Sequence, residues 1–449
     1  MIRIRSTTLL TGLSLILAVT SSFAQSTAQP PSQLTALQDQ QTLTGGVGMT
    51  IIDGKPYYLL HVTPELAFGK IGVGLDVNLR ISEDGQIRHE DFQDFNSYLQ
   101  IIRYVRYGQK HDPWYARIGA LDYSRLGHGY IMYMYRNTAS YDLRKVGVEF
   151  DADLGTFGFE SMYSDVSGGG VLGLRGYTRP LQFTDAASIP IVGKVETGVT
   201  LATDLNAYAK RTWGDSIGTI RASQGNGTLS ILGVDIGFPL LSQENVHSTL
   251  YADVAKIVSF GGGAAVGLDL ELRGLGLVTF NAKYERRIVG NRFMPSYFNA
   301  LYEHDRYQPV DSTRFVSKAQ LLSTSTAYDG YFGELLVSIL NTFNIVGGYQ
   351  APLGRPNGGT LHLEFETLKA MPGIVLSAGY DKQNIGSIFK LDNNSLLYAR
   401  VGYMPYPYLV VSTLYQWTWS EVHDPVTGKV TGYKSQKRIE PQVGFVVHF

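Results

Sequence analysis

The sequence contains no cysteine. A chain without cysteine cannot be held together by disulfides and cannot carry a lipid-modified N-terminal cysteine, so its stability must come from packing and hydrogen bonds. It also has no apolar run of the ~20 residues that a membrane-spanning helix needs. The formal net charge is only -1 at pH 7, with 38 basic and 39 acidic residues. No basic surface favours nucleic acid, and we expect no nucleic-acid partner.

Glycine and tyrosine are abundant instead, with 50 and 29 residues in a chain of 449. Apolar residues alternate with polar or small ones over much of the chain, most clearly in residues 71–81, 146–154, 264–273 and 361–367. Successive side chains of a β-strand point to opposite faces, so each of these stretches predicts a strand with one apolar and one polar face. The pattern predicts an all-β protein.

The N-terminus reads as an export signal. Residues 1–24 contain Arg3 and Arg5, then an apolar stretch, then small residues before Gln25. This layout is typical of a cleavable signal peptide, because the apolar stretch is too short to span a bilayer. We therefore exclude residues 1–24 from the fold, treat 25–43 as a polar periplasmic lead, and expect one domain over residues 44–449.

The links between predicted strands alternate between short and long. Short glycine-containing turns are expected at residues 69–70, 155–156 and 274–276, as in hairpins. Long links are expected at 82–96, 124–141, 288–328, 382–394 and 421–437. An up-and-down antiparallel barrel has this asymmetry, with tight turns at one rim and loops at the other. We expect an even count of about 18 to 22 strands, and residues 203–227 leave room for one further hairpin.

The apolar strand faces need a partner, and the sequence offers no second layer of amphipathic helices to cover them. A sandwich or a repeat array would be a soluble alternative, but the turns have no fixed period and hairpins follow one another without interruption. Lipid is then the best partner for the apolar faces. Only a closed barrel leaves no unpaired strand edge in hydrocarbon, so we predict a transmembrane β-barrel.

The chain ends in "VGFVVHF", with Phe445, Val447 and Phe449 on one face of a terminal strand. This ending resembles the C-terminal signal of bacterial outer-membrane β-barrel proteins. The resemblance implies a location in the Gram-negative outer membrane, with lipid around the barrel. It also implies that the barrel assembly machinery reads these three residues as an assembly signal.

The predicted inner face carries many charges, which cannot be buried unpaired, so we expect a water-filled lumen. The leading hypothesis is a porin-like channel for the passive or loosely selective transport of small polar solutes, with a mild cation preference from the excess of acids. The alternative is a non-conducting scaffold, adhesin or receptor that uses its long loops; an outer-membrane enzyme is third. The expected lining residues are Asp76, Asn78, Arg80, Glu149, Asp151, Asp153, Asp269, Glu271, Arg273, Lys283, Glu285, His362, Glu364, Glu366 and Arg400.

Two long segments break the alternation. Residues 288–328 are too long for a passive connection and rich in aromatics, so we expect them to fold into or over the mouth of the barrel; an exposed loop without a gating role is the alternative. Near His128, glycines allow a sharp bend, and Ser124 could pair with this histidine as nucleophile and base. Because the sequence supplies no orienting group for such a pair, we expect no enzyme. The acidic residues between 83 and 94 lack the ligand spacing of a calcium loop, so we expect no metal site, and we expect no cofactor.

Overall fold

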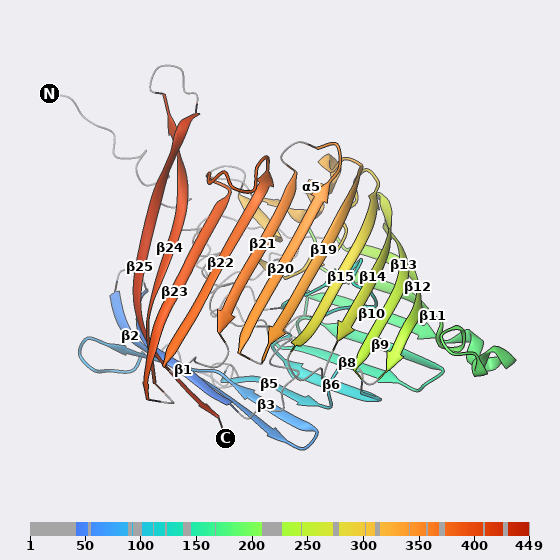
Figure 1. Ribbon diagram of the computed structural model, residues 1–449, viewed down its shortest axis with the longest axis horizontal. Helices are drawn as coiled ribbons and strands as arrows, with labels where there is room; N and C mark the ends of the chain where they lie inside the picture. Colours follow the sequence, from blue (N-terminus) through green and yellow to red (C-terminus); the bar gives the residue numbers. More distant parts are fainter. Residues whose placement is uncertain are drawn as a thin grey trace.

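The computed structural model describes residues 42–52, 55–88, 92, 101–110, 112–121, 124–137, 145–166, 168–208, 227–243, 245–272, 278–300, 302–309, 315–340, 342–355, 358–367, 373–406, 409–424 and 430–448. The predicted signal peptide and nearly all of the predicted lead lie outside these residues. The described residues are mostly in strands that run up and down in sequence order (Figure 1).

The first half of the chain forms the strands that follow the N-terminus around the wall. They are β1 (Thr42–Ile52), β2 (Lys55–Phe68), β3 (Ile71–Leu75), β4 (Val77–Ser82), β5 (Ile102–Tyr107), β6 (Trp114–Gly119), β7 (Met132–Tyr133), β8 (Gly147–Asp153), β9 (Phe157–Tyr163), β10 (Val171–Thr178), β11 (Glu196–Asp204), β12 (Leu229–Gln243), β13 (Val246–Ile257), β14 (Gly262–Leu272) and β15 (Val278–Val289).

The rest of the chain forms three short strands and the longer strands that complete the wall. They are β16 (Phe298–Asn299), β17 (Tyr307–Pro309), β18 (Phe315–Ser317), β19 (Tyr328–Ile339), β20 (Phe343–Pro352), β21 (Gly359–Thr367), β22 (Ile374–Ile385), β23 (Ser395–Tyr406), β24 (Leu409–His423) and β25 (Val430–His448). The short strands β7, β16, β17 and β18 are not part of the wall and pair only in two small separate sheets.

Among the described residues, the helices are few and short. They are the 3-10 helices η2 (Pro180–Phe183), η3 (Asp185–Ser188), η4 (Val192–Lys194) and η5 (Leu322–Thr324), with the α-helices α4 (Tyr302–Asp305) and α5 (Lys318–Leu321). Within the described ranges, none of the helices has the length and apolar character that crossing a membrane requires.

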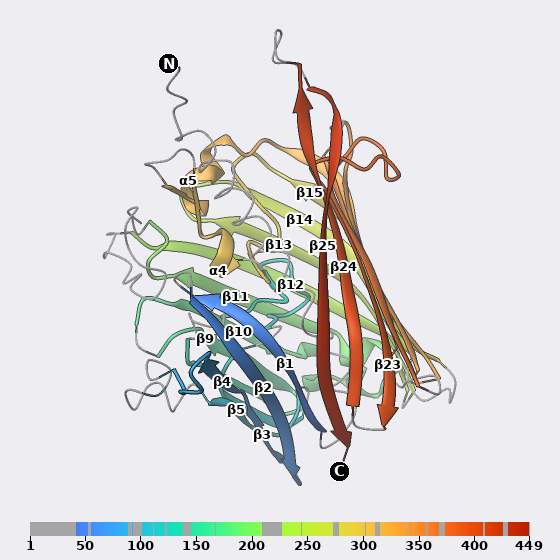
Figure 2. The same cartoon turned by 90° about the vertical axis from the view of Figure 1, so that its left-hand side faces the viewer.

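The wall closes on itself. Each wall strand pairs antiparallel with the next, and the last strand, β25, pairs with the first, β1, from Thr42 opposite His448 to Val47 opposite Val443. Figure 2 shows these two strands side by side near the C-terminus. Each strand of the wall is thus followed by a paired neighbour around the ring, and a closed ring of strands is the kind of sheet that can be placed in lipid. The predicted all-β antiparallel fold is confirmed.

The wall has 21 paired segments. Strand β2 pairs with both β3 and β4, which only Asp76 separates, so these two are halves of one strand and the segments occupy 20 positions around the ring. This number lies inside the range expected from the sequence. The possible extra hairpin in 203–227 falls mostly outside the described residues, so the exact strand number stays a prediction.

The tight turns form where glycine permits them. Gly69 and Gly155 have φ values of 59° and 86°, in the left-handed region that glycine enters without penalty, and the β2–β3 and β8–β9 hairpins turn back there as predicted. The third predicted turn, at 274–276, is not among the described residues. The long link expected at 421–437 is wrong: β24 and β25 stay paired up to His423 opposite Val430, because the alternation continues into a two-stranded ribbon.

The two faces of the wall differ as the alternation requires. On β14 and β15 the apolar side chains of Val266, Leu268 and Ile288 are exposed on the outside. Their neighbours Glu285 and Lys283 are buried inside the ring. On these two strands the outer face is thus apolar and the inner face carries charged residues, as in a transmembrane barrel.

Candidate functional site

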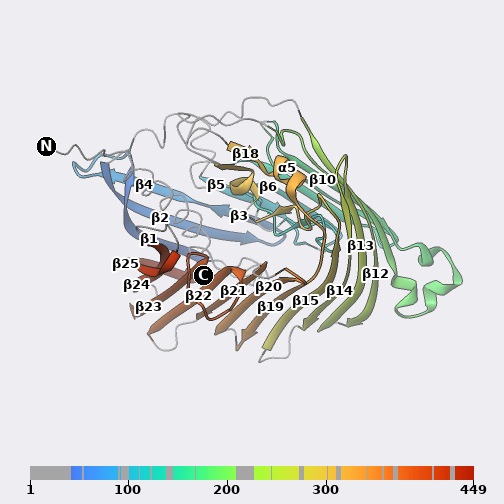
Figure 3. The ribbon, with the colours of Figure 1, turned by 90° about the horizontal axis from the view of Figure 1, so that it is seen from above.

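Two segments of the chain fold into the ring and meet there. The first inner segment (residues 120–137) links β6 to β8, and the second inner segment (residues 290–327) links β15 to β19. Figure 3, seen from above, places α5 and β18 of the second segment inside the outline of the wall. The segment predicted at 288–328 to fold into the mouth does so in its described part.

Backbone hydrogen bonds join the two inner segments. Strands β7 and β16 pair in parallel, and the N–H groups of Ser296 and Phe298 donate to the carbonyls of Tyr130 and Ile131 at 2.7 and 3.2 Å. Buried side chains of both segments form one hydrophobic cluster with the upper inner wall, including Met132, Tyr135, Phe293, Tyr297, Phe298 and Tyr302. The two segments therefore pack as one unit, although they are far apart in sequence.

Glycines on the inner face of the wall make room for this unit. A Cβ on Gly233 would lie 2.6 Å from Ile131, and one on Gly173 would lie 2.8 Å from Leu126. These glycines sit on β12 and β10, at inward positions of the alternation. Larger residues there would displace the first inner segment, so the sequence of the wall is fitted to it.

Polar contacts fix the first inner segment to at least four wall strands. The N–H of Gly127 donates to Glu160 on β9 at 2.7 Å, and Arg125 pairs with Asp269 on β14 at 3.3 Å. The Tyr133 hydroxyl donates to Glu334 on β19, and Lys283 on β15 donates to the carbonyl of His128. Each wall partner is an inward-facing residue, which places the segment in the lumen.

His128 is packed against the inner wall of the barrel. Burial lowers its pKa well below the usual range, and the nearby cations Arg125, Arg175 and Lys283 lower it further. The ring stacks on Tyr251 with centroids 4.2 Å apart and an interplanar angle of 9°. Its Nε2 lies 3.9 Å from Asp235, too far for a hydrogen bond.

The second inner segment is held by a buried ionic cluster around Asp204. Asp204, at the end of β11, accepts hydrogen bonds from the Tyr302 hydroxyl at 2.5 Å and from Arg306. Glu303 pairs with Lys145 at 2.8 Å and accepts from Tyr135 at 2.5 Å. This last contact again ties the second segment to the first.

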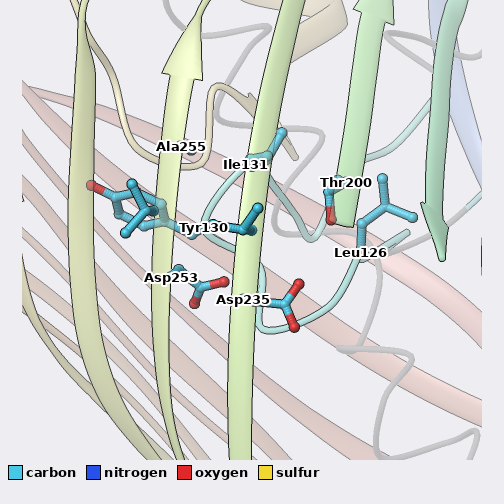
Figure 4. Close-up of a pocket in the computed structure, with 10 residues that line it drawn as sticks. Leu126, Tyr130, Ile131, Thr200, Asp235, Asp253 and Ala255 are labelled. Carbon is cyan, nitrogen blue, oxygen red and sulfur yellow. The ribbon is translucent and has the colours of Figure 1, made fainter. Parts of the chain in front are cut away.

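A small pocket lies where the first inner segment meets β11, β12 and β13 (Figure 4). Leu126, Tyr130 and Ile131 face the carboxylates of Asp235 and Asp253 across it. The two carboxylates are directly opposite each other on neighbouring strands. Arg175 neutralises Asp235, with Oδ1 and Oδ2 at 2.6 and 3.0 Å from the guanidinium.

The predicted lining residues that the structure describes face the interior. Those on β8 and β15 are tightly paired: Asp151 with Lys110 at 2.9 Å, and Glu285 with Lys283 at 2.9 Å. Asp153 pairs with Arg179 at 2.8 Å. That these residues line an open pore stays a prediction. Buried at 9% exposure or less are Asp76, Asn78, Arg80, Glu149, Asp151, Lys283 and Glu285; half-buried are Asp153, Asp269, Glu271, His362, Glu364, Glu366 and Arg400.

Arg273 lies outside the described residues, as do Phe449 and the side chains of Phe445 and Val447. The strand that carries the predicted assembly signal does form: Val447 is opposite Leu43, and Phe445 is opposite Gly45 on β1 and Leu409 on β24.

Several bases inside the ring were not among the residues predicted from the sequence to line it. Lys110, Arg125 and Arg179 lie in links between strands, where no alternation assigns a face, yet each pairs with an inward carboxylate. Arg175, on β10, pairs with Glu160, Glu196 and Asp235 at 3.2, 2.8 and 2.6 Å. Arg175 lies two residues after Gly173 on β10 and therefore on the same inward face. This position was the sequence signal that could have identified Arg175 as an inner residue.

The opposite wall is different. On β21 and β22, the His362 ring lies 2.6 Å from Asp381 and 3.7 Å from Glu364, and 39% of the His362 side chain is exposed. On β15, by contrast, only 2% of the Lys283 side chain is exposed. The contacts of the inner segments described above lie between β8 and β19. On β21 and β22, His362 is the accessible member of its group, while the side chains of Glu364 and Asp381 are 12% and 19% exposed.

The two residues considered for a catalytic pair, Ser124 and His128, do not contact each other through a hydrogen bond in the described part of the chain. Neither Ser124 Oγ nor His128 Nε2 has a hydrogen-bond partner among the described residues, so the two do not form a nucleophile and base pair. Among those residues, no group of three or more His, Asp or Glu side chains is arranged to hold a metal ion.

No protein-family model matches the chain, and no curated protein matches it. Weak likenesses exist among solved structures. OccK11 (OpdR) of Pseudomonas aeruginosa is 8% identical, with 91% of this chain and 94% of that chain covered and a TM-score of 0.31. Wzi of Escherichia coli, an outer-membrane carbohydrate-binding β-barrel, is 10% identical, with 93% and 86% covered and a TM-score of 0.37.

These likenesses are too distant to argue for any activity of this chain, and the assignment rests on its own geometry. A ring of antiparallel strands joined between its last and first strands, with an apolar outer face and charged residues inside, suits a bilayer. The described residues therefore have the architecture of a transmembrane β-barrel.

Proposed function

We propose that the protein is an outer-membrane channel for small polar solutes, in which the two inner segments fill one side of the lumen and leave the path along the other. The observation that carries this proposal is the contrast between the two walls. Lys283 and Glu285, beside the inner segments, are almost fully buried, whereas His362 on β21 is 39% exposed on its inner face. Accessible charges on an inner wall favour a water-filled path, because burying them unpaired is costly.

The inner segments then act as the constriction. They are packed as one unit and fixed to the wall by charged hydrogen bonds, so they narrow the lumen at a defined place. Inward loops of this kind limit the size of the solute that passes, and the charges on the wall formed by β21 and β22 select for its charge and polarity. Lipid around the barrel, small polar solutes inside it and the barrel assembly machinery during insertion are the partners that we propose. Catalysis is not part of the proposal.

The alternative, a scaffold, adhesin or receptor without conductance, is favoured by one observation. Strands β24 and β25 continue as a paired ribbon to His423 and Val430, beyond the ends of the neighbouring strands (Figures 1 and 2). A rigid ribbon that projects past the wall is a surface that another molecule could contact.

Conductance separates the two functions. Purified protein inserted into planar bilayers should give discrete conductance steps if it is a channel, and none if it is a scaffold. A swelling assay with liposomes in isotonic sugars and amino acids of increasing size would then give the size limit. Absence of both conductance and swelling, with the heat-modifiable barrel present on gels, would refute the channel.

A further inference from the structure

The link between β10 and β11 (residues 179–195) is built unlike the two-residue turns at the same rim. The helices η2, η3 and η4 fold it back on itself, and Gln182 donates to the carbonyl of Gly193 across its ends. A Cβ on Gly193 would lie 2.6 Å from the carbonyl oxygen of Ala187, so the turns touch each other. Arg179 ties the link to the wall through Asp153 at 2.8 Å and Glu196 at 3.0 Å. The link is thus a fixed protrusion.

Its surface is apolar. Phe183 is 70% exposed, and Ile189, Ile191 and Val192 are exposed as well. Between residues 180 and 195, Asp185 and Lys194 are the only charged residues in the sequence. Exposing such a cluster to water is unfavourable, and clusters of this kind mark contact surfaces.

The protrusion leaves the wall at a level marked by aromatic side chains. Trp114, Phe150 and Phe159 form an exposed outward row across β6, β8 and β9, with ring centroids 6.1 and 5.4 Å apart along it. Thr178, the last residue of β10, is opposite Phe157, the first residue of β9. In transmembrane barrels, girdles of aromatic residues lie at the boundary between hydrocarbon and water. The protrusion therefore starts at this boundary.

The protrusion also points in the direction expected for a segment at the membrane boundary. Figures 1 and 3 show η2, η3 and η4, in green, projecting sideways from the barrel next to β11 and β12. The outer faces of these strands are part of the apolar surface, with Val199 and Phe238 exposed near the protrusion. Membrane covers that surface, and the protrusion continues it outward in the plane of the membrane.

We propose that residues 180–195 form an interfacial anchor, whose side chains Phe183, Ile189, Ile191 and Val192 enter the phospholipid leaflet on the side of the tight turns. The short turns of a barrel of this class face the periplasm, so this is the periplasmic leaflet. Apolar side chains at the headgroup boundary bind by the area they bury, while Asp185 and Lys194 stay in water. Such an anchor fixes the depth and tilt of the barrel on one side.

Because the chain has no cysteine, single nitroxide labels can be placed without altering other positions. We would label Phe183→Cys and Ile191→Cys in full-length protein, reconstituted in vesicles of phosphatidylethanolamine and phosphatidylglycerol. Asp185→Cys is the matched control within the protrusion, Val199→Cys is the lipid reference on β11, and Lys70→Cys in a tight turn is the aqueous reference. The measurement is the accessibility of each label to oxygen, which concentrates in lipid, and to a water-soluble nickel complex.

The anchor predicts that the labels at Phe183 and Ile191 resemble that at Val199, with oxygen favoured over nickel. The label at Asp185 should resemble that at Lys70. Each variant is first checked for the heat-modifiable barrel, so misfolded protein does not enter the comparison. Labels at Phe183 and Ile191 that are as accessible to nickel as that at Lys70 would overturn the proposal, since the protrusion would then lie in water.

Discussion

Lys283 connects the wall to the first inner segment, and replacing it should loosen that segment. Its ammonium donates to the carbonyl of His128, lies 4.2 Å from the centre of the Tyr133 ring and pairs with Glu285 at 2.9 Å. The change Lys283→Met keeps the volume and removes the charge. Glu285 retains Arg287 at 2.6 Å and the Tyr251 hydroxyl at 2.8 Å, so the wall keeps its own pairing.

The effect on docking of the segment can be estimated from these contacts. A hydrogen bond from a charged donor contributes about 1.5–3 kcal/mol, and a cation over an aromatic ring about 0.5–2 kcal/mol. Relief from burying the ammonium offsets part of the loss, which leaves about 2–4 kcal/mol. Each 1.4 kcal/mol changes an equilibrium constant tenfold. The equilibrium between the docked and the released segment should therefore shift roughly 30- to 700-fold towards release.

Single-channel recording is the assay. Lys283→Met should show a larger or more frequent high-conductance state than the unmodified protein, and faster limited proteolysis between residues 120 and 137. The matched control is Lys382→Met, which removes an equally buried lysine bound to Asp392 and Ser395, away from the inner segments. Conductance and proteolysis unchanged in Lys283→Met, or changed equally in both variants, would refute the assignment of this lysine as a clamp.

Other perturbations test the faces, the assembly signal and the charge of the lumen. Deleting Phe449 should lower the membrane-inserted, heat-modifiable fraction because the signal acts during assembly; normal insertion would contradict this. Leu268→Arg, on the exposed outer face, should lower the free energy of unfolding by about 2–4 kcal/mol if the residue lies near the bilayer midplane. His362→Arg should lower it little, because Asp381 and Glu364 can accept hydrogen bonds from the guanidinium. Urea unfolding in vesicles compares the two variants, and equal losses of stability would argue against this face assignment. The double change Asp151→Asn and Asp153→Asn should shift the ion selectivity of the channel towards anions at low salt, because Lys110 and Arg179 lose their carboxylate partners. The reversal potential measures this shift, and a change towards cation selectivity would contradict the prediction.

The wall could be predicted because alternation is a local property. Residues 71–81 and 146–154 assign their own faces, and glycine at residues 69 and 155 marks the turns between strands. The extension of β24 and β25 was missed because residues 421–437 include Gly428 and Gly432, and such residues also favour a loop. Pairing of the two strands overrides this local preference.

The candidate site was less predictable because its contacts are not local. Nothing near Tyr133 in the sequence indicates Glu334 as its partner, and nothing near Arg125 indicates Asp269. The excess of acids expected on the inner face is offset by bases that were not among the predicted lining residues, some in links, such as Arg179, and some on strands, such as Arg175. A charge balance drawn from the predicted lining residues alone therefore overestimates the negative potential of the lumen.

The seam between β1 and β25 bears on how the chain folds. It has six paired positions, fewer than β1 shares with β2 or β24 with β25. Its partners lie roughly 400 residues apart, and closing a flexible loop of that length costs about 3 kcal/mol more than closing one of ten residues. Hairpins between neighbouring strands can therefore form first, and the seam forms last, when the sheet already holds its two ends close together. Substitutions in Thr42–Val47 should then slow the final step of folding and leave the earlier ones at their normal rate.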